Sequence, residues 1–126
     1  MPNRIMVVDD DKEVQEIVTF ALRRNGFEVE VASNGQQLQD MLTAHTPDLI
    51  ILDVMMPGLD GYQIFGNLRK NAKTQHVPVI IMTAHAEDIY QRISIDLGAA
   101  VHITKPFHPL ELVGRVQGLL QPIPQE

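Results

Sequence analysis

The sequence predicts an α/β fold in which one parallel β-sheet carries helices on both faces. Three observations lead to it: short apolar runs recur along the chain, amphipathic segments separate them, and capping residues mark the boundaries. Runs rich in Val and Ile are typical of strands, and nearly continuous apolar runs suit strands buried on both faces. We expect five strands, at Arg4–Val8, Glu28–Ala32, Asp48–Leu52, Val77–Met82 and Ala100–Ile103.

The segments between these strands carry apolar residues at helical spacing. The first has Val14, Ile17, Val18, Ala21 and Leu22, and the second has Leu38, Met41 and Leu42. Asn25–Gly26 is placed to end the first helix, Ser33–Gly35 to begin the second, and Gly98 to follow the fourth. The expected order is therefore βα repeated five times. Short right-handed connections favour a flavodoxin-like, doubly wound sheet with strand order 2-1-3-4-5, although periodicity alone leaves that order open.

Composition limits the possible classes of protein. A chain of 126 residues, 44% hydrophobic and 21% charged, is suited to one folded domain. We expect residues 1–121 to form it and residues 122–126 to be a short polar tail or the start of a linker. The net charge of −6 argues against direct contact with nucleic acid. The sequence has no apolar run near the roughly 18 residues of a membrane span, no signal peptide and no cysteine, so we expect a cytoplasmic protein.

Polar residues follow the predicted strands, where sheets of this kind bind ligands. Asp9–Asp11 follow the first strand, Asp53 the third, Thr83 the fourth and Lys105–Pro106 the fifth. Strands one, three and four are neighbours in the expected order, so Asp9, Asp10 and Asp53 should face one another. Carboxylates within ~5 Å repel by roughly 3 kcal/mol per pair at an effective dielectric constant near 20. Such a cluster needs a cation.

The available ligands are hard oxygens, which favour Mg²⁺ or Mn²⁺ over zinc, and we expect Mg²⁺. Mg²⁺ retains coordination positions for phosphoryl oxygens, so the site suggests phosphate chemistry. A carboxylate such as Asp53 can act as a nucleophile and form an acyl phosphate. Lys105 offers a compact positive charge and Thr83 a hydroxyl donor, a set that is sufficient for phosphoryl transfer.

Four motifs in this order resemble the response-regulator receiver domain of two-component signal transduction systems. They are Ile5–Asp11, Leu52–Gly61, Met82–Ala84 and Thr104–Phe107. The resemblance extends from residue 4 to about residue 120. Within the second motif, Pro57–Gly58 and Asp60–Gly61 are interpreted as turn residues beside the acceptor.

The resemblance implies that Asp53 accepts a phosphoryl group from a phosphohistidine of a sensor histidine kinase or a phosphotransfer protein. It also implies that Asp9, Asp10 and Asp53 hold Mg²⁺, and that Asp10 does so by direct coordination. The backbone carbonyl of Met55 would be a further ligand. Thr83 and Lys105 would bind the phosphoryl oxygens. The Lys105–Pro106 bond is usually cis in similar proteins.

The resemblance also indicates how the signal leaves the site. Thr83 and position 102 form the switch, and His102 stands where the family usually has Tyr or Phe. We therefore expect that the aromatic side chain contributes less to switching here and that switching depends to some extent on pH. Ala84 and His85 would modulate the site, since similar proteins tune water access there. A downstream effector would bind through helix four, strand five and helix five, with a homodimer possible on phosphorylation.

Several functions stay open at this point. The first is a phosphorylation-dependent switch, either a stand-alone regulator or a phosphorelay intermediate, with no enzyme activity beyond forming and losing its own acyl phosphate. The alternative is an N-terminal receiver fragment of a DNA-binding regulator. Receivers of one large subfamily of these regulators often carry acidic residues just before position 102 and pair them across a dimer interface. Here Ala99–Val101 stand at those positions, and only Arg115 fits the pattern. A Mg²⁺-dependent phosphatase would need an aspartate where Met55 stands. A nucleotide-binding flavodoxin-like protein would need a donor-rich loop in place of Asp9–Asp11.

Overall fold

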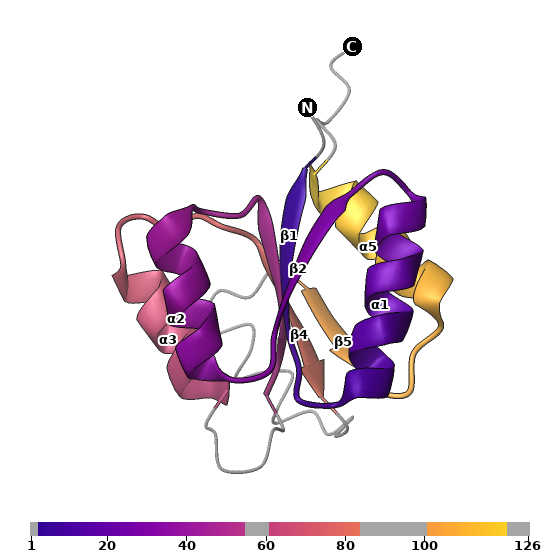
Figure 1. The fold of residues 1–126 in the computed structure, drawn as a ribbon, viewed down its shortest axis with the longest axis horizontal. Helices are drawn as coiled ribbons and strands as arrows, with labels where there is room; N and C mark the ends of the chain where they lie inside the picture. Colours follow the sequence, from indigo (N-terminus) through magenta and orange to yellow (C-terminus); the bar gives the residue numbers. More distant parts are fainter. Residues whose placement is uncertain (1–2, 55–60, 84–100, 121–126) are drawn as a thin grey trace.

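The computed structural model describes residues 3–54, 61–83 and 101–120, and within them it contains a five-stranded parallel sheet (Figure 1). The strand order is β2-β1-β3-β4-β5, which confirms the predicted topology. The strands are β1 (Arg4–Val8), β2 (Glu28–Ala32), β3 (Leu49–Asp53), β4 (Val79–Thr83) and β5 (Val101–Thr104).

The last three strands begin and end later than the sequence predicted. Pro78 has no N–H to donate, so β4 begins after it rather than at Val77. At the other end the ladder continues through polar residues, because Asp53 pairs with Met82 and Thr83 pairs with Thr104. Asp53 and Thr83 are therefore the last residues of their strands and not the first residues of loops.

Four helices are described: α1 (Lys12–Arg24), α2 (Gly35–Ala44), α3 (Gly61–Lys70) and α5 (Pro109–Leu120). Figure 1 shows α1 and α5 on one face of the sheet and α2 and α3 on the other. The helix predicted before Gly98 lies outside the described residues, as does the tail 122–126. No helix in the described part of the chain has the length and apolar character that crossing a membrane requires.

The sheet separates two hydrophobic clusters, because successive side chains of a strand point to opposite faces. On β1, Met6 and Val8 pack with α2 and α3, whereas Ile5 and Val7 pack with α1 and α5. All four side chains are fully buried. Burial on both faces explains why these strands appear in the sequence as continuous apolar runs.

Polar caps fix helix ends, among them the end of α1 and the start of α2 that the sequence predicted. Asp11 caps α1, and its Oδ1 accepts hydrogen bonds from the backbone N–H of Glu13 at 2.9 Å and of Val14 at 3.4 Å. Asn34 caps α2 and accepts from the N–H of Gln37 at 2.8 Å. Gly26 follows α1 with φ of 90°, a conformation that glycine adopts without strain.

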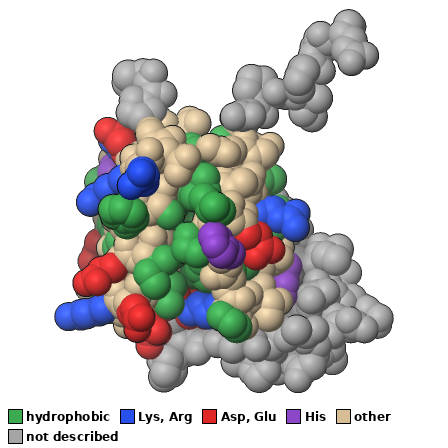
Figure 2. Space-filling view, turned by 90° about the vertical axis from the view of Figure 1, so that its right-hand side faces the viewer, with side chains coloured by type: hydrophobic (Ala, Val, Ile, Leu, Met, Phe, Trp, Pro, Cys, Tyr) green, Lys and Arg blue, Asp and Glu red, His purple; other side chains and the backbone are tan. Residues whose placement is uncertain are grey.

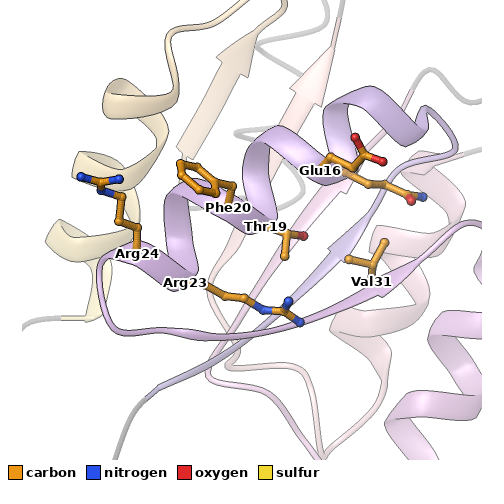
Figure 3. A pocket seen from close by; sticks show the side chains of 7 residues that line it. Glu16, Thr19, Phe20, Arg23, Arg24 and Val31 are labelled. Carbon is orange, nitrogen blue, oxygen red and sulfur yellow. The ribbon is translucent and has the colours of Figure 1, made fainter.

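Strand β2 is the outermost strand on its side of the sheet, and α1 covers part of it. Figure 3 shows Thr19 and Arg23 pointing toward β2 and Val31, whereas Phe20 and Arg24 point to the other side of the helix. The Arg23 guanidinium donates to the backbone carbonyl of Val29 at 3.2 Å. A side chain of α1 therefore satisfies a backbone acceptor of the outermost strand.

Large apolar side chains are exposed on α1 and at the start of α5. Ile17, Phe20 and Leu110 are 42%, 65% and 69% exposed. A groove lined in part by these three residues runs between the two helices, and Figure 2 shows hydrophobic side chains gathered on this face. We refer to Ile17, Phe20 and Leu110 as the α1–α5 apolar patch.

Gly61, the first residue of α3, is required for close packing rather than for a turn. A Cβ atom at this position would lie 2.3 Å from the Cα of Val54 and 2.9 Å from its Cβ. Gly26, not Gly61, is the glycine with positive φ among the residues described. The interpretation of Gly61 as a turn residue was therefore incomplete: its missing side chain lets α3 approach the residue that follows Asp53.

Replacing Gly61 by alanine should destabilise the domain by about 2 kcal/mol, because the backbone of Val54 must shift to admit the methyl group. Gly66→Ala is the matched control in the same helix, since nothing lies within 4 Å of an added Cβ there. It should stabilise the domain by about 0.5–1 kcal/mol. Urea unfolding followed by circular dichroism measures both, and a Gly61→Ala variant as stable as the wild type would contradict the packing argument.

Candidate functional site

Three buried polar side chains meet at the carboxyl ends of the central strands. Asp9 follows β1 directly and is fully buried, Asp53 ends β3 at 3% exposure, and Thr83 ends β4 and is fully buried. Among the described residues only Thr74 is a further buried polar side chain. The strand order brings residues from distant parts of the sequence to one edge of the sheet.

Asp9, Asp10 and Asp53 form an acidic cluster. Each offers a carboxylate oxygen, and these oxygens all lie within 4.8 Å of one another. Asp9 and Asp53 are buried, whereas Asp10 is exposed. The cluster therefore has a buried floor and an open side, which a ligand can reach from solvent.

Lys105 supplies a positive charge to the cluster. Its Nζ lies 2.8 Å from Oδ2 of Asp9 and 2.8 Å from Oδ2 of Asp53, and its side chain is 20% exposed. The loop that carries Lys105 is held to β4, because the backbone N–H of Lys105 donates to the carbonyl of Thr83 at 2.7 Å. The Lys105–Pro106 peptide bond is cis.

The electrostatics of the cluster follow from burial and from this pairing. Burial raises the pKa of Asp9 and the charge of Asp53 adds to this, whereas hydrogen bonds from Lys105 and Asp11 oppose the rise. Burial alone would lower the pKa of Lys105, but its hydrogen bonds to Asp53 and Asp9 outweigh it, and the pKa is raised. The cluster thus favours a charged lysine and disfavours an isolated charge on Asp9.

The donor set fits a divalent cation. With all three carboxylates ionised and one ammonium present, the cluster has a formal charge of −2, which one divalent cation balances. All three ligands are carboxylate oxygens, which hard cations prefer to soft donors such as sulfur. The acidic cluster therefore has the charge and the chemistry of a metal site.

His102 lies on β5, where it pairs with Ile81 in the adjacent strand. Its side chain is half-buried, and its buried Nε2 has no hydrogen-bond partner among the residues that the structure describes. Burial lowers the pKa of His102, so the neutral imidazole is favoured there. Met55, Ala84 and His85 lie outside the described residues.

Sequence reasoning missed Gln15, a residue of α1 that contacts the acidic turn, by which we mean Asp9–Asp11 after β1. Its Nε2 donates to the backbone carbonyl of Asp9 and to Oγ of Ser33. A glutamine on an amphipathic helix gives no signal of such a role in the sequence. Its contact with Ser33, eighteen residues away, becomes visible only in the fold.

Comparison with known proteins places this site in a family. Residues 5–117 match the model of the response regulator receiver domain. The chain is 40% identical over 121 residues to the regulatory protein VanRc of Enterococcus gallinarum, covering 96% of this chain and 51% of that protein. It is 37% identical over 123 residues to the phosphate regulon transcriptional regulatory protein PhoB of Escherichia coli (strain K12), covering 98% and 54%.

Solved structures agree. A putative response regulator from Chloroflexus aurantiacus J-10-fl matches with a TM-score of 0.88 and 34% identity, over 95% of this chain and 98% of that one. The chemotaxis response regulator CheY4 of Vibrio cholerae matches with a TM-score of 0.88 and 26% identity, over 95% and 100%.

The chain belongs to the response regulator receiver domain family. It is a signalling domain that acts as a phosphorylation-dependent switch. The chain spans about half the length of the curated relatives it matches.

Replacing Lys105 by methionine should destabilise the metal-free domain by about 3 kcal/mol, because it leaves two buried carboxylates without their cation. Excess Mg²⁺ should restore more stability to this variant than it adds to the wild type, because a bound cation neutralises the same carboxylates. Urea unfolding with and without Mg²⁺ measures both effects.

The matched control is Lys70→Met, at an exposed position of α3, which should change the free energy of unfolding by about 0.5 kcal/mol or less. Equal stability of Lys105→Met and wild type in metal-free buffer would show that Lys105 does not balance the cluster.

Proposed function

We propose that Asp53 accepts a phosphoryl group from the phosphohistidine of a sensor histidine kinase or a phosphotransfer protein, in a reaction that depends on Mg²⁺. The observation that carries the proposal is the environment of Asp53. Its carboxylate is buried at the end of β3, lies within an acidic cluster suited to a divalent cation, and is 2.8 Å from the ammonium of Lys105.

In the transfer step, a carboxylate oxygen of Asp53 forms a bond to phosphorus, and the bond from phosphorus to the histidine nitrogen of the donor breaks. The imidazole leaves with the electron pair of that bond. Mg²⁺, held by Asp9, Asp10, Asp53 and the carbonyl of Met55, would neutralise charge on the phosphoryl oxygens. Lys105 would pair with one of these oxygens and Thr83 would donate its hydroxyl to another, so this chain mainly supplies positioning and charge.

The switch is a shift between two conformations, since a phosphoryl group on Asp53 favours the one in which Thr83 and Lys105 contact it. We propose that His102 moves with Thr83. The two residues lie on adjacent strands, and within the described ranges the buried Nε2 of His102 has no hydrogen-bond partner to hold it in place. The surface that changes would comprise the predicted fourth helix, β5 and α5, and would bind an effector or a second copy of the chain.

We also propose that the protein that donates the phosphoryl group contacts the α1–α5 apolar patch. A second groove, lined in part by Val14, Ile17 and Phe107, lies beside Lys105 and shares Ile17 with the groove over the patch. A donor protein that brings a phosphohistidine to Asp53 would therefore contact the patch at the same time.

Two outputs fit the comparisons. We favour a stand-alone cytoplasmic regulator or a phosphorelay intermediate, because Ala99–Val101 stand where one large subfamily of DNA-binding regulators often carries acidic residues. The second candidate is the receiver part of a DNA-binding regulator, because PhoB is a transcriptional regulatory protein of about twice the matched length. In both, the chemistry of this domain is limited to gaining and losing its own phosphoryl group, with no direct contact to nucleic acid.

Incubation with a small-molecule phosphodonor and Mg²⁺ should add the mass of one phosphoryl group to the wild type, measured by intact mass spectrometry. Asp53→Asn should gain none, because an amide cannot form the acyl phosphate. Chelating Mg²⁺ beforehand should prevent the addition in the wild type.

Asp48→Asn is the matched control, since Asp48 is an exposed aspartate directly before β3, at the opposite end from Asp53. It should be phosphorylated like the wild type. An unmodified wild type, or an Asp53→Asn protein that still gains the phosphoryl mass, would refute Asp53 as the acceptor.

Replacing His102 by tyrosine should increase, by severalfold, the fraction of phosphorylated protein that adopts the switched conformation, because a larger aromatic ring buries more apolar surface as it moves inward. In the wild type this fraction should fall at low pH, since burial disfavours the imidazolium. Amide NMR shifts of β5 measure the fraction at each pH. Identical, pH-independent behaviour of the two proteins would remove His102 from the switch.

A further inference from the structure

We propose that Gln15 is a positioning residue for the metal site, whose side-chain amide holds the turn Asp9–Asp11 against the turn between β2 and α2. The inference rests on the proposed Mg²⁺ site and adds to it a residue outside the acidic cluster. Gln15 would not touch the cation. It would act through the backbone from which two of the carboxylates project.

The contacts of Gln15 join two parts of the chain. Its Nε2 donates to the carbonyl oxygen of Asp9, and also to Oγ of Ser33 at 3.0 Å. Its own backbone N–H donates to the carbonyl of Asp11 at 3.0 Å. Gln15 thus binds the acidic turn at both ends and ties it to the segment that follows β2.

Hydrogen bonds hold the N–H, the side chain and the carbonyl of Asp9. Its N–H donates to the carbonyl of Ala32 at 3.1 Å, and its Oδ1 accepts from the N–H of Asp11 at 2.9 Å. Gln15 supplies the remaining backbone contact, at the carbonyl. This carbonyl belongs to the peptide unit that joins Asp9 to Asp10. Its orientation therefore also fixes the position of the backbone nitrogen of Asp10, the exposed member of the cluster.

Ser33 is itself a fixed anchor. Its N–H donates to Oε1 of Gln37 at 2.6 Å, and the N–H of Gln37 donates to Oδ1 of Asn34 at 2.8 Å. Gln37 thus contacts both residues that precede α2, and the side chain of Asn34 caps the first turn of the helix. The amide of Gln15 therefore connects the acidic turn to a cap that has its own hydrogen bonds.

The chemistry of the cluster explains why such an anchor matters. Asp9, Asp10 and Asp53 repel one another, and the ammonium of Lys105 compensates the two buried members, Asp9 and Asp53. A turn free to relax would let Asp10 move away from the other two carboxylates. Holding the peptide between Asp9 and Asp10 in place preorganises the ligands, so less of the binding free energy is lost in assembling them.

A glutamine suits this role because its amide donates hydrogen bonds without carrying charge. Methionine has nearly the same length and flexibility but has no donor. A lysine or arginine would donate but would add positive charge beside a cation site. Gln15→Met therefore removes the hydrogen bonds and preserves the size of the side chain.

The test is the Mg²⁺ dissociation constant, measured by isothermal titration calorimetry on the unphosphorylated protein. Gln15→Met should raise Kd about tenfold, the lower range seen when a contact to a metal ligand is lost. Ser33→Ala, which removes one acceptor of the same amide, should raise it about threefold. The double variant should match Gln15→Met alone, since the two residues act through one contact.

Gln36→Met is the matched control. Gln36 is an exposed glutamine of α2 whose Nε2 donates to Asp40 at 3.0 Å, away from the acidic turn, so Kd should not change. Circular dichroism establishes that each variant is folded. If Gln15→Met does not fold, Ser33→Ala decides the test, because it removes a single hydroxyl outside the helix.

The outcomes separate this inference from the proposed function. A wild type that binds no Mg²⁺ overturns both. A wild type that binds Mg²⁺, together with folded Gln15→Met and Ser33→Ala proteins of unchanged Kd, overturns only the role of Gln15. Lower stability with unchanged Kd would likewise show a structural contact and no positioning role.

Discussion

The ammonium of Lys105 lies between the carboxylates of Asp9 and Asp53, and the functional end of the sheet depends on this pairing. Two buried carboxylates near one another are stable only with a compensating charge. The lysine provides it without filling the open side of the cluster, where Asp10 lies. Under the proposed function, the same ammonium that balances the resting domain would contact a phosphoryl group on Asp53, so stability and signalling would depend on one interaction.

The strand order makes this arrangement possible. With β1 next to β3, and β3 next to β4, the ends of three strands from distant parts of the chain lie side by side. The loop after β5 reaches back through the bond from the Lys105 N–H to the Thr83 carbonyl. Thr83 and Lys105 are consequently linked in the structure described, without any phosphoryl group. A change at Asp53 has a short path of bonded residues to β5 and the start of α5.

Much of the fold and of the site could be predicted from the sequence, because alternating apolar runs and capping residues are local signals. Polar residues at the strand ends misled the prediction by a residue or two: Asp53 and Thr83 resemble loop residues, yet the ladder continues through them. Gly61 and Gln15 could not be interpreted fully. The need for glycine arises from the backbone of Val54, and the role of the glutamine from Asp9 and Ser33, contacts that exist only once the chain is folded.

The hydrogen bond from Arg23 to Val29 hinders the pairing of two copies of this domain at the β2 edge of the sheet. An outermost strand with free backbone groups is a template on which another chain can add a strand, and proteins avoid such joining by covering the edge or placing charge on it. The guanidinium does both at β2. One arginine of α1 thus helps to keep neighbouring molecules from pairing at this edge of the sheet.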